Sequence, residues 1–332
     1  MGRKQLTADS ALAMLIFVTL IWGMTFIWMK IALNEAEHLL GTDADLGVLK
    51  TLIVALRFLL AFILLLMFHR GSRQGLRDSS AIKGGMILGL LMFGGFWLQI
   101  WAIEDVTPAV SAFLTSLYVV FTAIVGTAIG WQRLTRWLIV GVVLATGGAA
   151  ILGLNSEMGA AGLDMTAFGW PEWLTVAGAF LFALHILATD RITKQVDPLQ
   201  VSLTSFGIVA IAGFLTMILV MLVDSSDSLS MTDLVTLSTS WRFTGSIVCL
   251  GVFGSLCAIT LLNYCQRFIS PLRAALIYAL EPVWALLFSI MLGLEILSIW
   301  LWIGGGALLA GNLLVELPRV LKLEGHASDE EA

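Results

Sequence analysis

The chain has few charged residues, few cysteines and no dense block of basic residues. Only 12% of its 332 residues are charged and 59% are hydrophobic, which excludes a soluble globular domain of this length. The absence of a lysine- or arginine-rich block argues against a nucleic-acid partner. The formal net charge of −5 says little by itself, because in a membrane protein the distribution of charges between the two faces matters more than their sum.

The residues that usually carry chemistry are equally sparse. Cys249, Cys257 and Cys265 lie eight residues apart on one predicted helix, where neighbours are separated by roughly 12 Å of rise, too far for a disulfide bond. The four histidines form no cluster with carboxylates or cysteines, so the sequence predicts no metal site. No glycine-rich nucleotide loop occurs either, and we expect no cofactor and no ATP-driven activity of the chain's own.

Apolar stretches long enough to cross a bilayer follow one another along almost the whole chain. About 20 apolar residues suffice to cross the hydrocarbon, and the first stretch lacks the small-residue cleavage site of a signal peptide. We therefore predict an all-α integral membrane protein with ten transmembrane helices. The predicted spans are residues 10–33, 48–69, 82–103, 107–130, 136–154, 171–190, 199–223, 241–266, 270–294 and 296–317.

The basic residues are distributed unequally between the predicted loops. With the N-terminus inside, 14 of the 18 lysines and arginines fall in cytoplasmic segments, three fall outside, and Arg57 lies within a span. By the positive-inside rule both termini face the cytoplasm. We expect a multi-pass protein of the inner or plasma membrane.

The second half of the sequence repeats the first. The segment PAVSAFLTSLYVVFTAIVGTAIGWQRL from Pro108 aligns without a gap on PLRAALIYALEPVWALLFSIMLGLEIL from Pro271, an offset of 271 − 108 = 163 residues. Because each copy holds five spans, the second copy enters the membrane upside down, and inverted repeats with a site between them are typical of secondary transporters. We expect five-helix repeats at residues 1–154 and 171–317, an outer connecting loop at 155–170 and a cytoplasmic tail at 318–332.

These features resemble the EamA branch of the drug/metabolite transporter superfamily. The most specific motif is LEPVWALLFSIMLGLE at 280–295, and weaker ones are LIWGMTFIWMK at 20–30, ALRF at 55–58, AFLTSLYVVFTAI at 112–124 and ALHILATDR at 183–191. The resemblance implies ten helices around a central cavity and transport, often outward, of small metabolites such as amino acids or their derivatives. The family usually carries a proline in place of Val119, and a glutamate is common in place of Gln132, so we expect the two repeat-related helices to be unequal.

Polar residues that share one face of an apolar helix predict the lining of such a cavity. Thr115 and Tyr118 lie on one face, and their partners 163 residues later are Tyr278 and Glu281. Alternatively, the hydroxyls bond to carbonyls of their own helix and the aromatic rings pack or anchor at the membrane interface. The predicted substrate-binding residues are Trp22, Thr25, Trp97, Trp101, Thr115, Tyr118, His185, Asn263, Tyr264, Tyr278 and Glu281.

Three ionisable side chains lie inside the predicted spans, where a charge costs roughly 2.5–3.5 kcal/mol. Glu281 precedes Pro282, whose ring leaves a carbonyl of the preceding turn unpaired; the pair forms either a proton-coupling site or a structural hinge. Arg57 is either the counter-charge for a substrate carboxylate or a partner of Glu281 or of backbone carbonyls. His185 either titrates near neutrality or is a buried packing residue.

Together these observations favour a secondary transporter or facilitator, with export as the expected direction. The expected substrate is a small neutral or zwitterionic metabolite such as an amino acid, moved by alternating access. A lipid or lipid-precursor flippase would share the fold and is the main alternative, whereas a membrane-embedded enzyme would need a cluster of reactive side chains. We expect a small molecule and membrane lipids as partners; a homodimer is left open.

Overall fold

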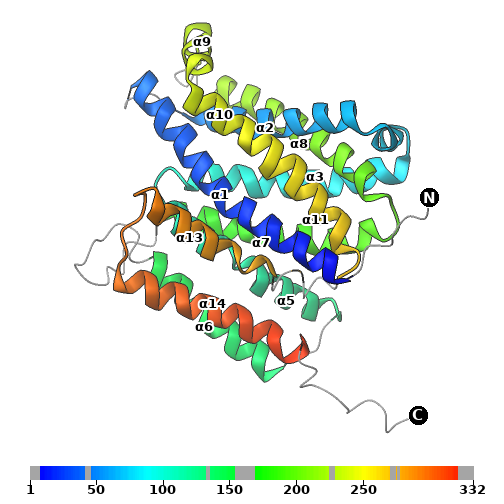
Figure 1. The fold of residues 1–332 in the computed structure, drawn as a ribbon, viewed down its shortest axis with the longest axis vertical. Helices are drawn as coiled ribbons and strands as arrows, with labels where there is room; N and C mark the ends of the chain where they lie inside the picture. Colours follow the sequence, from blue (N-terminus) through cyan, green and yellow to red (C-terminus); the bar gives the residue numbers. More distant parts are fainter. Residues whose placement is uncertain are drawn as a thin grey trace.

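The chain folds into a bundle of apolar helices, shown in Figure 1 for this computed structural model. The structure describes residues 8–41, 46–131, 135–153, 169–223, 229–269, 274 and 277–320, and no strand occurs within these ranges. The helices in chain order are α1 (Ala8–Leu40), α2 (Gly47–Phe68), η1 (Arg70–Leu76), α3 (Ser79–Ala102), α4 (Pro108–Thr115), α5 (Tyr118–Ala128), α6 (Arg136–Gly153), α7 (Trp170–Thr193), α8 (Pro198–Val223), α9 (Met231–Thr239), α10 (Trp241–Cys249), η2 (Leu250–Cys257), α11 (Ala258–Gln266), α13 (Glu281–Met291) and α14 (Ile299–Val320).

Seven stretches of helix among the described residues are long and apolar enough to cross a membrane. They are Ser10–Leu40, Gly47–Phe68, Ser79–Ala102, Pro108–Ala128, Trp170–Thr193, Pro198–Val223 and Trp241–Gln266. Three shorter apolar helices lie at Arg136–Leu152, Glu281–Met291 and Ile299–Leu314. The prediction of an all-α, multi-pass membrane protein is thereby confirmed, and the three cysteines are free.

Some local elements differ from the prediction. α1 continues to Leu40, and the segments expected to be loops between spans contain the short helices η1 and α9. α9 begins at a capping box, in which Ser230 Oγ accepts from the backbone N–H of Asp233 at 3.1 Å and the Asp233 carboxylate accepts from the N–H of Ser230 at 2.9 Å. This Ser-x-x-Asp signal was available in the sequence. Gln132 and most of the predicted outer loop and tail lie outside the described residues.

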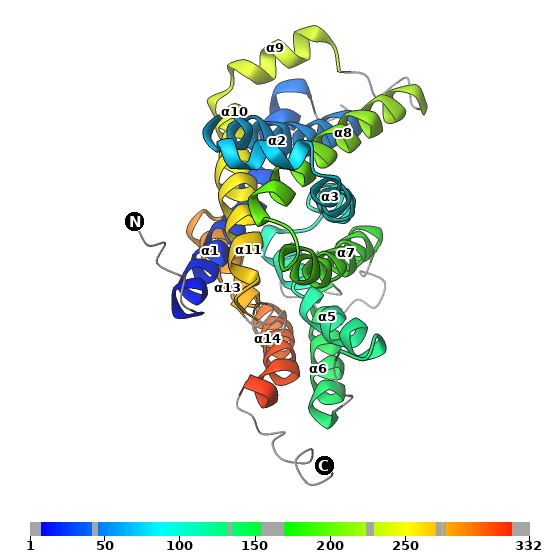
Figure 2. The ribbon, with the colours of Figure 1, turned by 90° about the vertical axis from the view of Figure 1, so that its right-hand side faces the viewer.

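The helices pair mainly between the two halves of the sequence. α6 and α14 lie side by side at one edge of the bundle, and α2 and α8 form the opposite edge (Figure 2). Between these edges α3 packs against α7 and α8, while α1 packs against α10, α11 and α13. Because each of these contacts joins one half of the chain to the other, the halves share a single core.

Glycines allow α6 and α14 to approach closely. A Cβ built on Gly148 would lie 2.5 Å from the carbonyl oxygen of Gly304, and one built on Gly311 would lie 2.6 Å from that of Gly141. Gly141 and Gly304 are 163 residues apart, as are Gly148 and Gly311, so both copies supply the same small residues to this interface. Small residues of this kind let membrane helices pack backbone against backbone.

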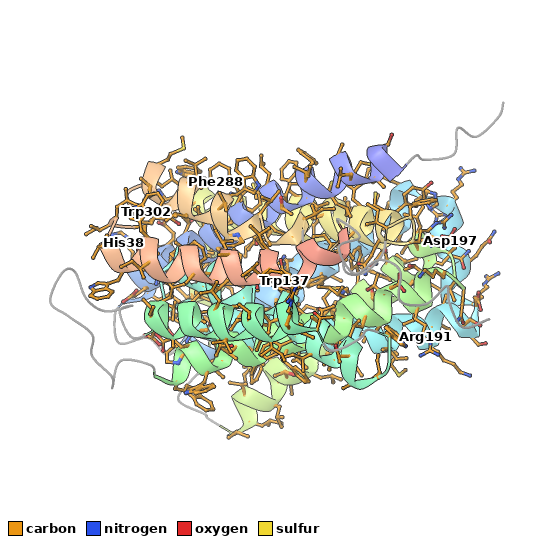
Figure 3. All side chains as sticks on the ribbon, turned by 90° about the horizontal axis from the view of Figure 1, so that it is seen from below. His38, Trp137, Arg191, Asp197, Phe288 and Trp302 are labelled. Carbon is orange, nitrogen blue, oxygen red and sulfur yellow. The ribbon has the colours of Figure 1, made fainter. Side chains whose placement is uncertain are left out.

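The ends of the bundle separate the polar segments. The start of α1, the end of α14 and η1 lie at one end (Figure 1). Seen from below, Arg191 and Asp197 lie at one end of the molecule, whereas His38 and Trp302 lie at the other (Figure 3). The described ends of the chain are therefore on the same side of the bundle.

The helix that carries Thr115 and Tyr118 is broken. α4 ends at Thr115 and α5 starts at Tyr118, and 163 residues later a turn at 279–280 separates Tyr278 from the start of α13. The expectation that the two repeat-related helices would be unequal is therefore wrong at this point. Pro282 ends hydrogen bonding in the second copy because it has no N–H, but the first copy has Val119 there and needs another cause.

In the first copy, side chains satisfy the broken backbone. Ser116 Oγ donates to the carbonyl of Phe113 at 2.7 Å. The buried amide of Asn312 on α14 donates to Ser116 O at 3.3 Å and to Ser116 Oγ at 3.1 Å. Val119 N–H also donates to Ser116 O at 3.0 Å. Asn312 thus supplies a second donor to the carbonyl at the break.

We expect Val119→Pro to be tolerated in this protein, because Ser116 O keeps Asn312 as a donor when the N–H of residue 119 is lost. Ala123→Pro, in the interior of α5, should instead cost about 3 kcal/mol or more. Combining Val119→Pro with Asn312→Leu should leave Ser116 O without either donor and destabilise the protein by about 1–3 kcal/mol beyond the sum of the single changes. Thermal unfolding of the four purified variants in detergent measures this coupling, and strict additivity would remove Asn312 from the account of the break.

Candidate functional site

A cavity lies at the level of the broken helices. Its volume is about 50 Å³, and its walls come from α1, α3, α4, α5, α7, α11 and the first turn of α13. Most of the lining is apolar, with a few hydrogen-bonding groups among the rings and aliphatic side chains. The lining residues are Trp22, Thr25, Met92, Phe96, Gln99, Thr115, Tyr118, Phe182, His185, Ile186, Ile259, Leu262 and Glu281.

The lining is built from equivalent positions of the two halves. Gln99 and Leu262 are 163 residues apart and both line the cavity, as do Phe96 and Ile259. When the two motifs at 20–30 and 183–191 are aligned, Thr25 pairs with His185 at an offset of 160, and Trp22 pairs with Phe182 at the same offset. Each half therefore provides one side of the same wall.

Tyr118 and Glu281 link the halves directly. Tyr118 Oη donates to Glu281 Oε2 at 3.0 Å, and these two positions are themselves repeat equivalents, since 281 − 118 = 163. Equivalent positions of two repeats can touch only near the axis that relates the repeats. The hydrogen bond therefore marks the centre of the pseudosymmetric arrangement, where the rings of Tyr118 and Tyr278 also meet edge to face with centroids 6.4 Å apart.

The structure brings about half of the predicted substrate-binding residues to this cavity. The predicted residues on its wall are Trp22, Thr25, Thr115, Tyr118, His185 and Glu281. Contact with a substrate remains a prediction for all of them. His185 Nδ1 lies 3.5 Å from Thr189 Oγ1, and its Nε2 has no hydrogen-bond partner among the described residues.

The predicted residues on the second-half helices lie behind the wall. Tyr278 Oη donates to Gln266 Oε1 at 3.4 Å, and Gln266 Nε2 in turn donates to the carbonyl of Ile186 at 2.8 Å. Asn263 Nδ2 donates to Ser202 Oγ at 2.9 Å. Tyr264 lies nearer the end of α11, with the guanidinium of Arg267 5.4 Å from its ring centroid. These side chains connect helices rather than face the cavity.

Trp97 and Trp101 also point away from the cavity. Trp97 Nε1 donates to Thr51 Oγ1 at 3.1 Å, and the ammonium of Lys50 lies 4.5 Å above the ring of Trp101. Lys50 forms an ion pair with Glu104, and Lys30 donates to the backbone carbonyl of Glu104. The two tryptophans thus belong to a polar cluster that ties α1, α2 and α3 together at the His38 end of the bundle.

Comparison with known proteins identifies the family. Residues 9–154 and 169–317 each match the EamA-like transporter family. The chain belongs to this family. It is similar to an uncharacterized transporter of Archaeoglobus fulgidus, with 26% identity over 321 residues that cover 95% of this chain and 88% of that protein.

Two further similarities agree with this membership. The uncharacterized inner membrane transporter YedA of Escherichia coli strain K12 is 26% identical over 305 residues, covering 91% of this chain and 89% of that protein. A solved crystal structure superimposes with a TM-score of 0.64 at 17% identity, covering 96% of this chain and 99% of that one; at this identity it supports the fold alone. The predicted resemblance is confirmed, and this EamA-like chain is a membrane transporter by family.

Sequence reasoning missed the apolar part of the site. Phe182 could have been found, because it occupies the position of Trp22 in the second half. Met92, Phe96 and Ile259 carry no such signal, since an apolar residue in an apolar helix faces lipid, core or cavity with equal plausibility. Among the described residues no group of three or more His, Cys, Asp or Glu side chains could hold a metal ion.

The two tyrosines should differ in importance, because only Tyr118 presents its ring and hydroxyl to the cavity. Tyr118→Phe removes the donor to Glu281, and a hydrogen bond to a carboxylate contributes about 1.5–3 kcal/mol, so we expect solute flux in proteoliposomes to fall roughly tenfold or more. Tyr278→Phe removes one hydroxyl behind the wall and serves as the matched control, with flux within about threefold of the parent. Equal losses in two folded variants would contradict this assignment of the wall.

Proposed function

We propose that this EamA-like transporter is a secondary carrier or facilitator for a small neutral or zwitterionic metabolite, such as an amino acid or a derivative, and that it works outward. Its ten helices form two inverted five-helix repeats, with both termini in the cytoplasm. The observation that carries the proposal is the central cavity, whose wall comes from equivalent positions of both halves and whose halves touch through Tyr118 and Glu281. A site shared in this way changes shape when one half moves against the other.

The polarity of the wall supports a solute that is partly apolar. Rings from Trp22, Phe96 and Phe182 face the cavity, and the polar groups there are few. Sites for small molecules are commonly lined by apolar and aromatic side chains with a small number of placed polar groups. A lipid tail would need a lateral opening, whereas this cavity lies among seven helical elements.

The size of the cavity supports a closed conformation. About 50 Å³ is far below the roughly 300–1,000 Å³ of typical ligand sites, so the helices must separate before a metabolite enters. Gln99 Nε2 donates to Thr115 Oγ1 at 3.3 Å on one side, and Tyr278 donates to Gln266 on the other. Thr115 and Tyr278 are repeat equivalents, as expected if alternating access opens these two contacts in turn.

The test of this proposal is a comparison of intracellular and extracellular metabolites in cells with and without the protein. An exporter should lower the internal and raise the external level of a small set of related solutes, and purified protein in proteoliposomes should move the same solutes. Unchanged metabolite levels together with no flux of any candidate would reject the proposed function.

Glu281 is proposed as the site at which proton exchange couples to transport, because its carboxyl faces the cavity and bonds to a side chain rather than to backbone. Glu281→Gln should abolish accumulation driven by a pH gradient while passive exchange of solute continues. Glu295→Gln, which changes a partly buried carboxyl outside the spans, is the matched control. If the Glu281 variant responds to the gradient as the parent does, the carboxyl only braces the turn before Pro282.

The proposed orientation predicts the sidedness of two exposed positions. In a variant without the native cysteines, Ser238→Cys at the end of α9 should react with an impermeant maleimide in intact cells. Gln74→Cys in η1 should react only after permeabilisation. The two sites are both exposed, so the reverse labelling pattern would invert the topology rather than report burial.

A further inference from the structure

Arg57 is a buried cation without an anionic partner. Its side chain is among the largest that are fully enclosed, with 1% of the residue exposed. Nε donates to Ser255 Oγ at 2.9 Å, Nη1 lies 4.0 Å from Met29 Sδ, and Nη2 has no hydrogen-bond partner among the described residues. No ion pair of the described chain involves Arg57, so the predicted alternative of pairing with Glu281 is not formed.

Such an arrangement is costly in a protein interior. A buried guanidinium loses its hydration, and this loss is offset only when an anion and further hydrogen bonds replace the water. Arginine offers a planar fork of donors that fits a carboxylate through two parallel hydrogen bonds. Two of the three guanidinium nitrogens of Arg57 lack an oxygen acceptor, which is the condition in which an external carboxylate can bind.

The surrounding backbone makes room for this side chain. A Cβ on Gly254 would lie 3.2 Å from Arg57 Nη2 and 2.7 Å from the methyl group of Thr25, and a Cβ on Gly251 would lie 3.1 Å from the carbonyl oxygen of Arg57. Both glycines belong to η2, a π-helical stretch in the middle of an otherwise α-helical span. π-Helical turns inside α-helices are frequent at functional sites.

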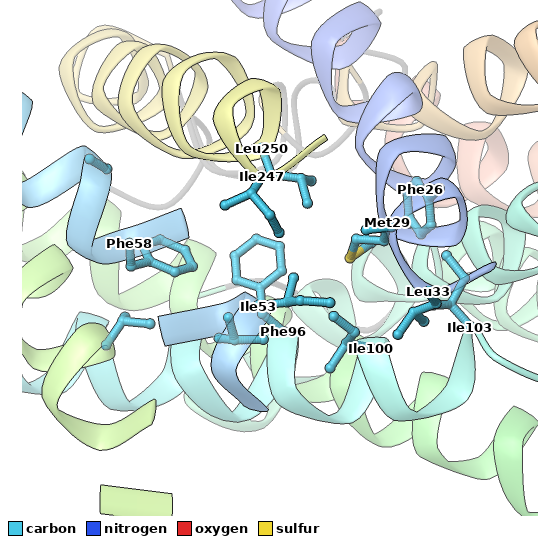
Figure 4. Close-up of a cluster of buried hydrophobic side chains, with 14 of the residues drawn as sticks. Phe26, Met29, Leu33, Ile53, Phe58, Phe96, Ile100, Ile103, Ile247 and Leu250 are labelled. Carbon is cyan, nitrogen blue, oxygen red and sulfur yellow. The ribbon is translucent and has the colours of Figure 1, made fainter. Parts of the chain in front are cut away.

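Only two side chains separate Arg57 from the cavity. The Arg57 guanidinium carbon lies 4.3 Å from the ring centroid of Phe96, and Phe96 and Thr25 both line the cavity. Figure 4 shows Phe96 in the buried cluster where α1, α2, α3 and α10 meet, beside Phe58. Since the cavity must enlarge to admit a metabolite, displacement of the Phe96 ring joins it to the unpaired nitrogens.

We propose that Arg57 is the subsite for a carboxylate on the transported solute, with Phe96 as the side chain that moves to admit it. This inference rests on the proposed function and narrows its substrate class to small carboxylates, amino acids included, whose apolar remainder packs against Trp22 and Phe182. Ser255 holds the guanidinium in place through Nε and leaves Nη1 and Nη2 for the solute.

The test uses purified full-length protein and three pairs of probes, each a carboxylate with its neutral amide: acetate and acetamide, butyrate and butyramide, benzoate and benzamide. At constant ionic strength, at least one carboxylate should raise the Tm saturably by roughly 2–4 °C, and its amide should not. Arg57→Gln should abolish this difference. Lys83→Gln, which removes one exposed positive charge from the start of α3, should keep it.

A second variant guards against misfolding of Arg57→Gln. Phe96→Ala removes the ring between the cavity and the guanidinium, so the carboxylate should then act at a concentration about tenfold lower than in the parent. Equal responses to carboxylates and amides in both the parent and Phe96→Ala would overturn the carboxylate subsite. An exported solute that lacks a carboxylate would also overturn it while leaving the transport function intact.

Discussion

Inside a membrane the backbone must satisfy its own hydrogen bonds, because the hydrocarbon supplies no donor or acceptor. The two broken helices at 116–117 and 279–280 are therefore the positions on which the rest of this structure depends. Each break is enclosed by protein, and the break in the first half is completed by Asn312 from the last helix. The glycine contact between α6 and α14 brings Asn312 within reach, so packing at one edge of the bundle supports the geometry at its centre.

The same breaks create the site. Where a helix is interrupted, side chains such as Tyr118 and Glu281 can turn toward the centre, and here they meet across the axis between the halves. Polar contacts gather on either side of this point: Gln99 with Thr115, and Gln266 with Tyr278. The cavity between these contacts is small because both are formed. A transporter built in this way can open one contact only by moving one half of the bundle against the other.

Two buried charged groups lie near the centre in different states of pairing. Glu281 has a hydrogen-bond donor from the opposite half, whereas Arg57 has a hydroxyl on Nε and no carboxylate within the described chain. The difference follows from position, because Glu281 lies on the axis between the repeats and Arg57 lies behind the aromatic wall. A membrane protein retains an incompletely paired arginine at an energetic cost, and such residues usually mark a pathway for solutes or ions.

The sequence by itself determined the apolar helices, their approximate ends and the 163-residue repeat, since hydrophobic runs and internal similarity do not depend on how helices meet. It also pointed to Tyr118 and Glu281, because polar residues in apolar spans are conspicuous. Only the tertiary structure decided that Trp97 and Trp101 pack on Thr51 and Lys50 while apolar Phe96 lines the cavity. The physical reason is that in lipid every face of a helix is apolar, so composition cannot distinguish a lipid-facing side chain from one that lines a cavity.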